Sequence, residues 1–226
     1  MYELTESVPR SEIRSLQAGL LNPRCRKIKR VCDVVLVLAL GLVALPFAAA
    51  IALAIVLETP GPVFFGHMRV GRDRRRFRLW KFRSMVVDAD AVFRKHLEEH
   101  PEHRAEWLNT HKLKNDPRVT RVGRLLRRSS LDELPQLWNV LRGEMSMIGP
   151  RPIVEDEIPK YGPAFSLYTQ VSPGLTGLWQ VSGRNDTTYR QRTALDEEYI
   201  LHWSLWKDLA VLLRTVRVVI LGHGAY

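Results

Sequence analysis

Two adjacent carboxylates, Asp132 and Glu133, lie where a helix is expected to begin, shortly after the basic pair Arg127 and Arg128. Apolar residues at positions 134, 137, 138 and 141 have the spacing of an amphipathic helix, which should end near Gly143. A carboxylate at the positive end of a helix is held ionised and lies where backbone amides attract phosphate. Such an aspartate is suited to attack phosphorus or to hold a divalent metal on a diphosphate.

The position at which this helix begins has two interpretations. Ser130 and Glu133 have the spacing of a capping box, in which the acidic pair would only close the helix end. Pro135 argues against that register, because proline beyond the first turn removes a hydrogen bond. A helix that begins at Asp132 places Pro135 inside the first turn, where no donor is needed. Capping alone remains the alternative to a chemical role.

Two further stretches contain side chains suited to a phosphorylated ligand. Arg151 lies in a Gly-Pro-Arg-Pro sequence, whose prolines stiffen the backbone around a side chain that suits phosphate. Residues 172–185 combine glycines, a tryptophan, a glutamine and an arginine in one loop-rich stretch. These are components of a nucleotide pocket, although a plain surface turn is the alternative for Arg151.

The longest uncharged apolar run covers residues 34–57 and contains Pro46 near its middle. As one straight helix it would reach about 36 Å, enough for a bilayer core of about 30 Å. Both flanks carry clusters of Lys and Arg, which mark the cytoplasmic side of a membrane, and proline kinks or breaks a helix. We therefore expect a re-entrant helix-break-helix; a kinked spanning helix and a buried core helix are the alternatives.

The composition favours one domain with an anionic partner, because the 226 residues carry a net charge of +10. The two cysteines, Cys25 and Cys32, indicate neither a disulfide framework nor a zinc site. After a turn at residues 59–62, the stretches 63–70 and 76–82 predict a β-hairpin around a basic loop. Residues 199–221 keep helical apolar spacing, which fits an interfacial amphipathic helix or ordinary core packing.

A solvated helical stretch is expected from residue 88 to residue 107, interrupted by Pro101. Four histidines lie in it or just after it: His96, His100, His103 and His111. Their spacing is compatible with metal ligands, but Pro101 disturbs the helical register and charged neighbours dominate. A solvated surface is therefore favoured over a ligand set.

Five segments occur in the order found in one known family. They are KFRSM at 81–85, SLDELPQLWNVLRG at 130–143, MSMIGPRP at 145–152, PGLTG at 173–177 and QVSGRN at 180–185. From about residue 29 to residue 226, the chain resembles the bacterial sugar transferases of the monotopic phosphoglycosyl transferase superfamily. Those enzymes start the repeat units of exopolysaccharide, capsule and O-antigen. Residues 183–186 and 203–206 look most like members that use UDP-galactose, with UDP-glucose as the alternative.

The resemblance implies transfer of hexose 1-phosphate from a UDP-hexose to undecaprenyl phosphate, with release of UMP. In such enzymes the aspartate at the position of Asp132 is the nucleophile, forms a covalent phosphosugar intermediate and has Mg²⁺ bound beside it. Glu133 completes the acidic dyad. The residues expected to bind phosphate are Arg127, Arg151, Lys81 and Arg83, and those expected at the nucleotide are Gln180 and Arg184. For Lys81 and Arg83, packing and salt bridges within the hairpin are the alternative.

The expected fold class is α+β and mostly helical: a re-entrant membrane helix, a small β-hairpin, catalytic helices and an interfacial C-terminal helix. Residues 1–30 are expected to form a leader, residues 31–58 the re-entrant helix, and residues 59–226 a catalytic domain on the cytoplasmic face of the bacterial inner membrane. The implied partners are UDP-hexose, undecaprenyl phosphate, membrane lipids and, in a homodimer, a second copy, but no nucleic acid. A membrane-anchored protein that only binds anions through its basic surface is the alternative of a different class.

Overall fold

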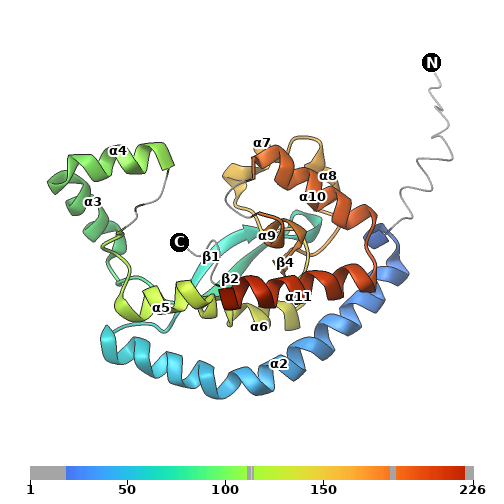
Figure 1. Cartoon of the computed structure of the whole chain (residues 1–226), viewed down its shortest axis with the longest axis horizontal. Helices are drawn as coiled ribbons and strands as arrows, with labels where there is room; N and C mark the ends of the chain where they lie inside the picture. The colour runs from blue at the N-terminus through green and yellow to red at the C-terminus, as the bar shows by residue number, and fades with distance from the viewer. Residues whose placement is uncertain (1–18, 111–112, 114, 184–186, 222–226) are drawn as a thin grey trace.

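The computed structural model describes residues 19–110, 113, 115–183 and 187–221, which form an α+β fold that is mostly helical. Figure 1 shows one long curved helix, α2, along an edge of the molecule, with α3 and α4 at the opposite end from α7, α8 and α10. The helices are α2 (Pro23–Glu58), α3 (Ala89–Glu99), α4 (Pro101–Thr110), α5 (Arg121–Ser129), α6 (Gln136–Leu141), α7 (Ile158–Tyr161), α8 (Ala164–Tyr168), α9 (Leu178–Val181), α10 (Tyr189–Leu201) and α11 (Leu205–Leu221). Single 3-10 turns are η1 (Gly19–Leu21), η2 (Arg72–Arg74), η3 (Leu131–Glu133) and η4 (Glu155–Glu157).

The membrane-type helix α2 is continuous, whereas the sequence predicted a break at Pro46. It begins at Asn22, whose side chain accepts a hydrogen bond from Arg24 N at 2.9 Å, and Pro23 occupies the first turn, where no donor is required. Pro46 removes a single backbone hydrogen bond, which a long helix accommodates by bending rather than ending. Residues 23–30 thus belong to the same helix as the apolar run.

Most large apolar side chains of α2 are exposed, so the rest of the protein does not cover this helix. Its most apolar window is 6% buried, and by length and composition α2 is able to cross a membrane. The exposed residues are Ile28, Val31, Val35, Leu38, Leu40, Leu42, Val43, Leu45, Phe47, Leu53, Val56 and Leu57. This surface supports membrane association of the chain.

Two small sheets complete the fold. Strands β1 (Phe64–Val70) and β2 (Arg76–Phe82) form the predicted antiparallel hairpin, with a register from Phe64 opposite Phe82 to Val70 opposite Arg76. Strands β3 (Ser146–Ile148) and β4 (Gly174–Thr176) pair in parallel, and the sequence did not predict them. A Cβ on Gly174 would overlap the backbone of Gly149, so this close approach requires glycine.

The C-terminal apolar stretch forms two helices rather than one. Helix α10 ends at Leu201, and Ser204 Oγ accepts from Lys207 N at 3.1 Å at the start of α11. Helix α11 buries Val211 and exposes other apolar residues, among them Trp206, so it is amphipathic as predicted.

Both ends of α2 are bonded to the helices that flank the acidic pair. Near its start, Arg30 donates to the Val140 and Leu141 carbonyls at the C-terminus of α6, the latter at 2.8 Å. At its end, the Glu58 carboxylate accepts from Arg121 N and Val122 N at the N-terminus of α5, at 2.6 and 2.9 Å. Each charge has the sign that the helix dipole favours. The long helix therefore fixes α5 and α6 relative to each other.

A buried charge network joins α2 to the C-terminal helices. The ammonium of Lys29 lies 2.8 Å from Asp208 Oδ2 and 3.6 Å from Asp33 Oδ1. Asp208 also accepts from Tyr199 and from Trp203 Nε1, at 2.6 and 3.0 Å. Asp33 accepts from Ser146 Oγ at 2.7 Å and from Met147 N at 3.0 Å, which adds β3 to the network. One cation therefore balances two buried carboxylates.

Replacing Lys29 by Met should lower the free energy of unfolding by about 3–5 kcal/mol, because Asp33 and Asp208 would lose their only common cation in this network. The measurement is chemical unfolding of the full chain in detergent micelles. Lys27→Met is the matched control, since Lys27 is exposed on the same helix. Equal stability of the two variants would contradict the network.

Candidate active site

The acidic pair lies in the short turn η3 between α5 and α6. Helix α5 ends at Ser129, and its C-cap Ser130, whose φ of 57° lies in the left-handed region, turns the chain. Pro135 has no N–H to donate to the Leu131 carbonyl, which instead accepts from Leu134 N at 3.3 Å. This loss converts the expected first helical turn into a 3-10 turn.

The structure therefore corrects the predicted helix boundary. Helix α6 begins at Gln136, with Pro135 at its N-cap, rather than at Asp132. The capping-box alternative is also wrong, because the Ser130 side chain makes no capping hydrogen bond. The Glu133 side chain faces the hairpin instead.

One ammonium group holds both carboxylates. Lys81, near the end of β2, places Nζ 3.1 Å from Asp132 Oδ2 and 2.7 Å from Glu133 Oε1. Asp132 is buried, while Glu133 and Lys81 are half-buried. Hydrogen bonds between ionised groups are the strong ones, so this bridge fixes both side chains in one place. The structure thus unites three of the predicted site residues.

Arg127 is the second cation near Asp132. Its Nε donates to Ser84 Oγ at 2.9 Å, which fixes the guanidinium between the hairpin and α5. Its positive charge acts to lower the pKa of the Asp132 carboxyl. Ser84 lies inside the KFRSM segment, but nothing else in the sequence distinguished it from its neighbours.

Asn139 is a second site residue that was not predicted from the sequence. Its amide is fully buried, accepts from Trp80 N at 3.1 Å, and donates to Arg78 O at 2.8 Å and to Glu144 Oε2 at 2.6 Å. It thereby pairs the free edge of β2 with α6 and holds Lys81 opposite the dyad. A polar residue inside an amphipathic helix was the signal available in the sequence.

Burial raises the pKa of the Asp132 carboxyl above its usual range, and Glu133 acts in the same direction. Lys81 and Arg127 oppose this shift. The sequence had predicted that a helix end would hold the carboxylate ionised. The net direction is the opposite because removal from water is the largest effect, and water exclusion depends on the tertiary fold. For Lys81, burial lowers the pKa, but Glu133 and Asp132 outweigh it and raise the pKa.

Arg83 lies away from these carboxylates. Its guanidinium donates to the Thr59 and Pro60 carbonyls and to Thr59 Oγ1, the latter two at 3.1 Å. The side chain is buried and holds the turn that follows α2. The structure thus favours the packing alternative for Arg83.

Arg151 and Gln180 belong to a second cluster near the turn of the hairpin. The Arg151 guanidinium lies 5.6 Å from the centre of the Trp179 ring, and the guanidinium of the buried Arg192 lies 4.9 Å from the same ring centre. Burial is the largest cause of a lowered pKa at Arg69. The nearby charges of Arg151 and Arg192 lower this pKa further. Gln180 follows Trp179 on α9 and is half-buried.

The two clusters lie at opposite ends of the hairpin. Ile153, two residues after Arg151, bridges Val70, whereas Lys81 pairs with Phe65, five positions along β1. At about 3.4 Å per residue, these positions are about 17 Å apart. No signal in the sequence indicated Arg69 or Arg192. Arg184, the remaining predicted residue, lies outside the described residues.

The family profile described as bacterial sugar transferase matches residues 24–222. The chain belongs to this family. It is 50% identical over 208 residues to the UDP-galactose-lipid carrier transferase of Erwinia amylovora, covering 92% of this chain and 43% of that protein. It is 42% identical over 227 residues to the exopolysaccharide production protein ExoY of Sinorhizobium fredii, with both chains fully covered.

A third relative is named UDP-glucose:undecaprenyl-phosphate glucose-1-phosphate transferase, from Escherichia coli. The identity is 40% over 210 residues, covering 89% of this chain and 42% of that protein. The chain therefore spans less than half the length of the Erwinia and Escherichia relatives, but the whole length of ExoY.

Replacing Lys81 by Met should raise the pKa of Asp132 further, because the largest opposing charge is removed. In the unaltered protein the carboxyl should already titrate above the ordinary aspartate value of about 3.9. The measurement is ¹³C NMR of the labelled carboxyl, assigned by its loss in Asp132→Asn. Lys95→Met, on exposed α3, is the control and should leave the midpoint unchanged. A lower midpoint in Lys81→Met would contradict the assignment.

Proposed function

We propose that the chain transfers hexose 1-phosphate from a UDP-hexose to undecaprenyl phosphate and releases UMP. The observation that carries this proposal is the buried Asp132, held with Glu133 by Lys81, in a member of the bacterial sugar transferase family. The names of two relatives, a UDP-galactose-lipid carrier transferase and a UDP-glucose:undecaprenyl-phosphate transferase, support the choice of substrates.

The reaction proceeds in two displacements at one phosphorus. An Asp132 carboxylate oxygen attacks the sugar-bearing phosphorus of UDP-hexose, the bond to the bridging oxygen breaks, and UMP leaves. A phosphate oxygen of the lipid then attacks the same phosphorus, and the Asp132 carboxylate is released. The product is hexose-diphosphate-undecaprenol. Separating the steps keeps the two polyanions from having to occupy the site together.

Lys81 and Arg127 supply the positive charge that this reaction requires. Two anionic substrates must approach a site that already contains two carboxylates, and preorganised cations offset the repulsion. Lys81 also orients Asp132, since it lies 3.1 Å from Oδ2. Glu133 shares the ammonium and competes for it, which leaves Asp132 more nucleophilic than in a one-to-one ion pair.

The dyad is suited to Mg²⁺. Asp132 and Glu133 both approach the Lys81 ammonium within 3.1 Å, so their oxygens lie close together. Carboxylate oxygens are the hard ligands that Mg²⁺ prefers, and substrate phosphates usually complete its coordination. Asp132 and Glu133 would hold the ion. When bound, it would neutralise charge on the diphosphate.

We assign the second cluster to the nucleotide end of the donor. Arg69, Arg151 and Arg192 concentrate positive charge, and Trp179 offers a ring on which a base can stack. Gln180 is adjacent, and Arg184 remains a candidate by its sequence position. A donor laid along the hairpin would thus have its sugar phosphate near Asp132.

Galactose is the hexose we favour, with glucose as the alternative, and the reaction would be the first membrane step of exopolysaccharide, capsule or O-antigen synthesis. The similarity to a protein named for UDP-galactose at 50% identity, against 40% for the UDP-glucose protein, supports this order.

Asp132→Asn should reduce UMP release from UDP-galactose by at least about 1,000-fold and abolish the covalent phosphosugar adduct, because the nucleophile is removed. The measurements are UMP release with undecaprenyl phosphate and Mg²⁺, and intact-protein mass spectrometry. Asp156→Asn, at an exposed carboxylate of η4, is the control. A persistent adduct would refute the role of Asp132. Absence of lipid-linked sugar with the unaltered chain and both donors would favour an anion-binding protein.

We further propose that α2 is re-entrant and that the catalytic domain lies on the cytoplasmic face of the inner membrane. Lys29 at one end of α2 pairs with Asp208, and Glu58 at the other end caps α5, so both ends hold the same body. A spanning helix would place its ends on opposite sides. The basic clusters on both flanks favour one cytoplasmic face.

Cysteines at Lys27 and Arg75, introduced singly after Cys25 and Cys32 are replaced by serine, should both react with an impermeant maleimide from the cytoplasmic side only. Both positions are exposed and lie on either side of the apolar run. The measurement compares intact spheroplasts with inverted vesicles. Labelling of the two positions from opposite sides would indicate a spanning helix. Labelling of Val43→Cys from the periplasmic side would also contradict the re-entrant topology.

A further inference from the structure

Helices α3 and α4 form a hairpin that stands at one end of the molecule (Figure 1). The predicted interruption at Pro101 is confirmed, since α3 ends at Glu99 and α4 begins at Pro101. The two helices contact each other, so side chains that would be distant on one straight helix are brought together. The transferase chemistry proposed above uses none of these residues.

The contact between the two helices consists largely of aromatic rings. Phe93 of α3 and Trp107 of α4 have ring centroids 4.7 Å apart. The centroids of the three histidines lie 4.5 Å apart for His96 and His100, 4.9 Å for His96 and His103, and 5.3 Å for His100 and His103. All three histidines are half-buried. They contact one another where the two helices meet and keep part of their surface exposed, so the predicted solvated surface is not contradicted.

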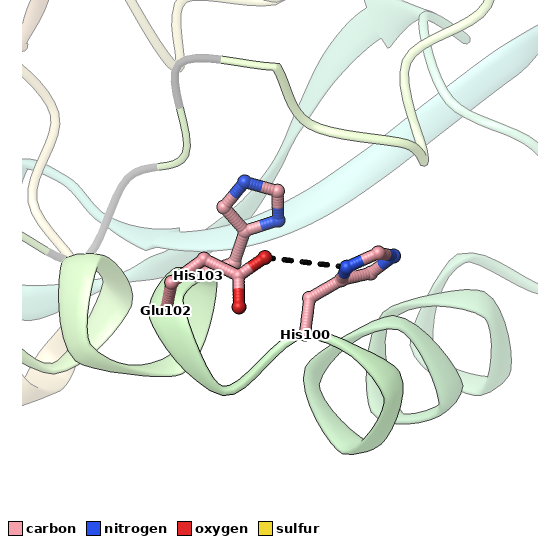
Figure 2. Close-up of side chains that lie close together, drawn as sticks. All are labelled: His100, Glu102 and His103. Carbon is pink, nitrogen blue, oxygen red and sulfur yellow. Dashed lines mark ion pairs between the residues drawn. The ribbon is translucent and has the colours of Figure 1, made fainter.

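Several potential ligand atoms converge at this point. His96 Nε2 and His103 Nδ1 are 2.8 Å apart, and His100 Nδ1 lies 3.3 Å from Glu102 Oε1. Figure 2 shows the Glu102 carboxylate turned toward His100, with the His103 ring beside it. Ligand atoms of His100, Glu102 and His103 lie within 4.8 Å of one another.

The hydrogen bond between two of the rings is compatible with metal binding. In a hydrogen bond between two imidazoles, the accepting ring must carry a free lone pair, so His96 or His103 is neutral in that ring position. Three rings in contact beside a single carboxylate cannot all be charged without repulsion. Neutral imidazole is the form that binds metal ions.

We propose that His96, His100, His103 and Glu102 form a binding site for a divalent transition metal such as Zn²⁺. Three imidazole nitrogens and one carboxylate oxygen make a four-ligand set of the type Zn²⁺ takes, at about 2.0–2.2 Å from the ion. In a tetrahedral site, ligand atoms lie about 3.3 Å apart, and those of His100, Glu102 and His103 already lie within 4.8 Å of one another. His96 would complete the set by exchanging its 2.8 Å hydrogen bond to His103 for a bond to the metal. Mg²⁺ prefers oxygen ligands and is not expected here.

The site is connected to the catalytic region through one arginine. The Arg118 guanidinium lies 4.0 Å from the Phe93 ring centre and 5.4 Å from that of Trp107, so it covers the aromatic contact. It also pairs with Asp116 at 2.6 Å. Asp116 and Arg118 both act electrostatically on Arg127, the cation near Asp132. A metal would therefore stabilise the α3–α4 helix pair, which contacts Arg118 and through it Asp116 and Arg127.

The test is metal binding by the full chain, purified without a polyhistidine tag in detergent micelles. One equivalent of Co²⁺ should give the intense visible absorption of tetrahedral coordination, and Zn²⁺ should displace it while millimolar Mg²⁺ should not. His103→Gln and His100→Gln should each lose this absorption. His202→Gln, at an exposed histidine elsewhere, should keep it. A pale octahedral spectrum, or equal binding by all four proteins, would overturn the proposal.

Hydrogen exchange provides a readout that does not depend on activity. At free Zn²⁺ 100-fold above the dissociation constant, local opening of α3 and α4 should slow about 100-fold. The His103→Gln protein should show no such slowing, with its far-UV circular dichroism unchanged. Unaltered exchange in the unmodified chain would overturn the proposal, whereas loss of transferase activity in Asp132→Asn would leave it standing.

Discussion

The bridge from Lys81 to Asp132 and Glu133 is the interaction on which the arrangement of the candidate active site depends. Two adjacent carboxylates repel each other, and burial of Asp132 removes the water that would screen them. An ammonium shared between them offsets both costs and fixes their orientation. The hairpin must therefore lie against η3, and Asn139 and Ser84 supply the hydrogen bonds that keep it there. Much of the surrounding architecture can be understood as support for that one ion bridge.

Helix α2 links membrane attachment to the geometry of the site. Its exposed apolar surface is directed away from the protein, yet Arg30 and Glu58 satisfy the ends of the two helices between which the dyad lies. These two residues are 28 positions apart, about 42 Å along the helix axis. A change in the curvature of α2 would therefore alter the separation of α5 and α6. Helix α2 is thus connected through α5 and α6 to the turn that contains Asp132.

Several Lys and Arg side chains of this chain fall into three groups with different roles. Lys29 and Arg83 are buried and structural, since they hold α2 to α11 and the turn at residues 59–60. Lys81 and Arg127 surround the dyad. Arg69, Arg151 and Arg192 form a separate cluster with Trp179 at the far end of the hairpin. The net charge of +10 therefore does not describe one uniform basic surface, and a simple anion-binding protein would not need this separation.

The sequence by itself determined the features that depend on near neighbours. The turn at residues 59–62 and the basic loop between two short stretches predicted the hairpin, Pro101 divided α3 from α4, and the motif order indicated the family. Only the tertiary structure decided which positively charged side chain pairs with which carboxylate. Lys81 and Arg83 are two residues apart at the end of β2, yet Lys81 reaches the dyad and Arg83 reaches the Thr59 turn. The upward pKa shift of Asp132 and the meeting of His96 with His103 likewise required packing, because water exclusion and contacts between helices are set by segments distant in sequence.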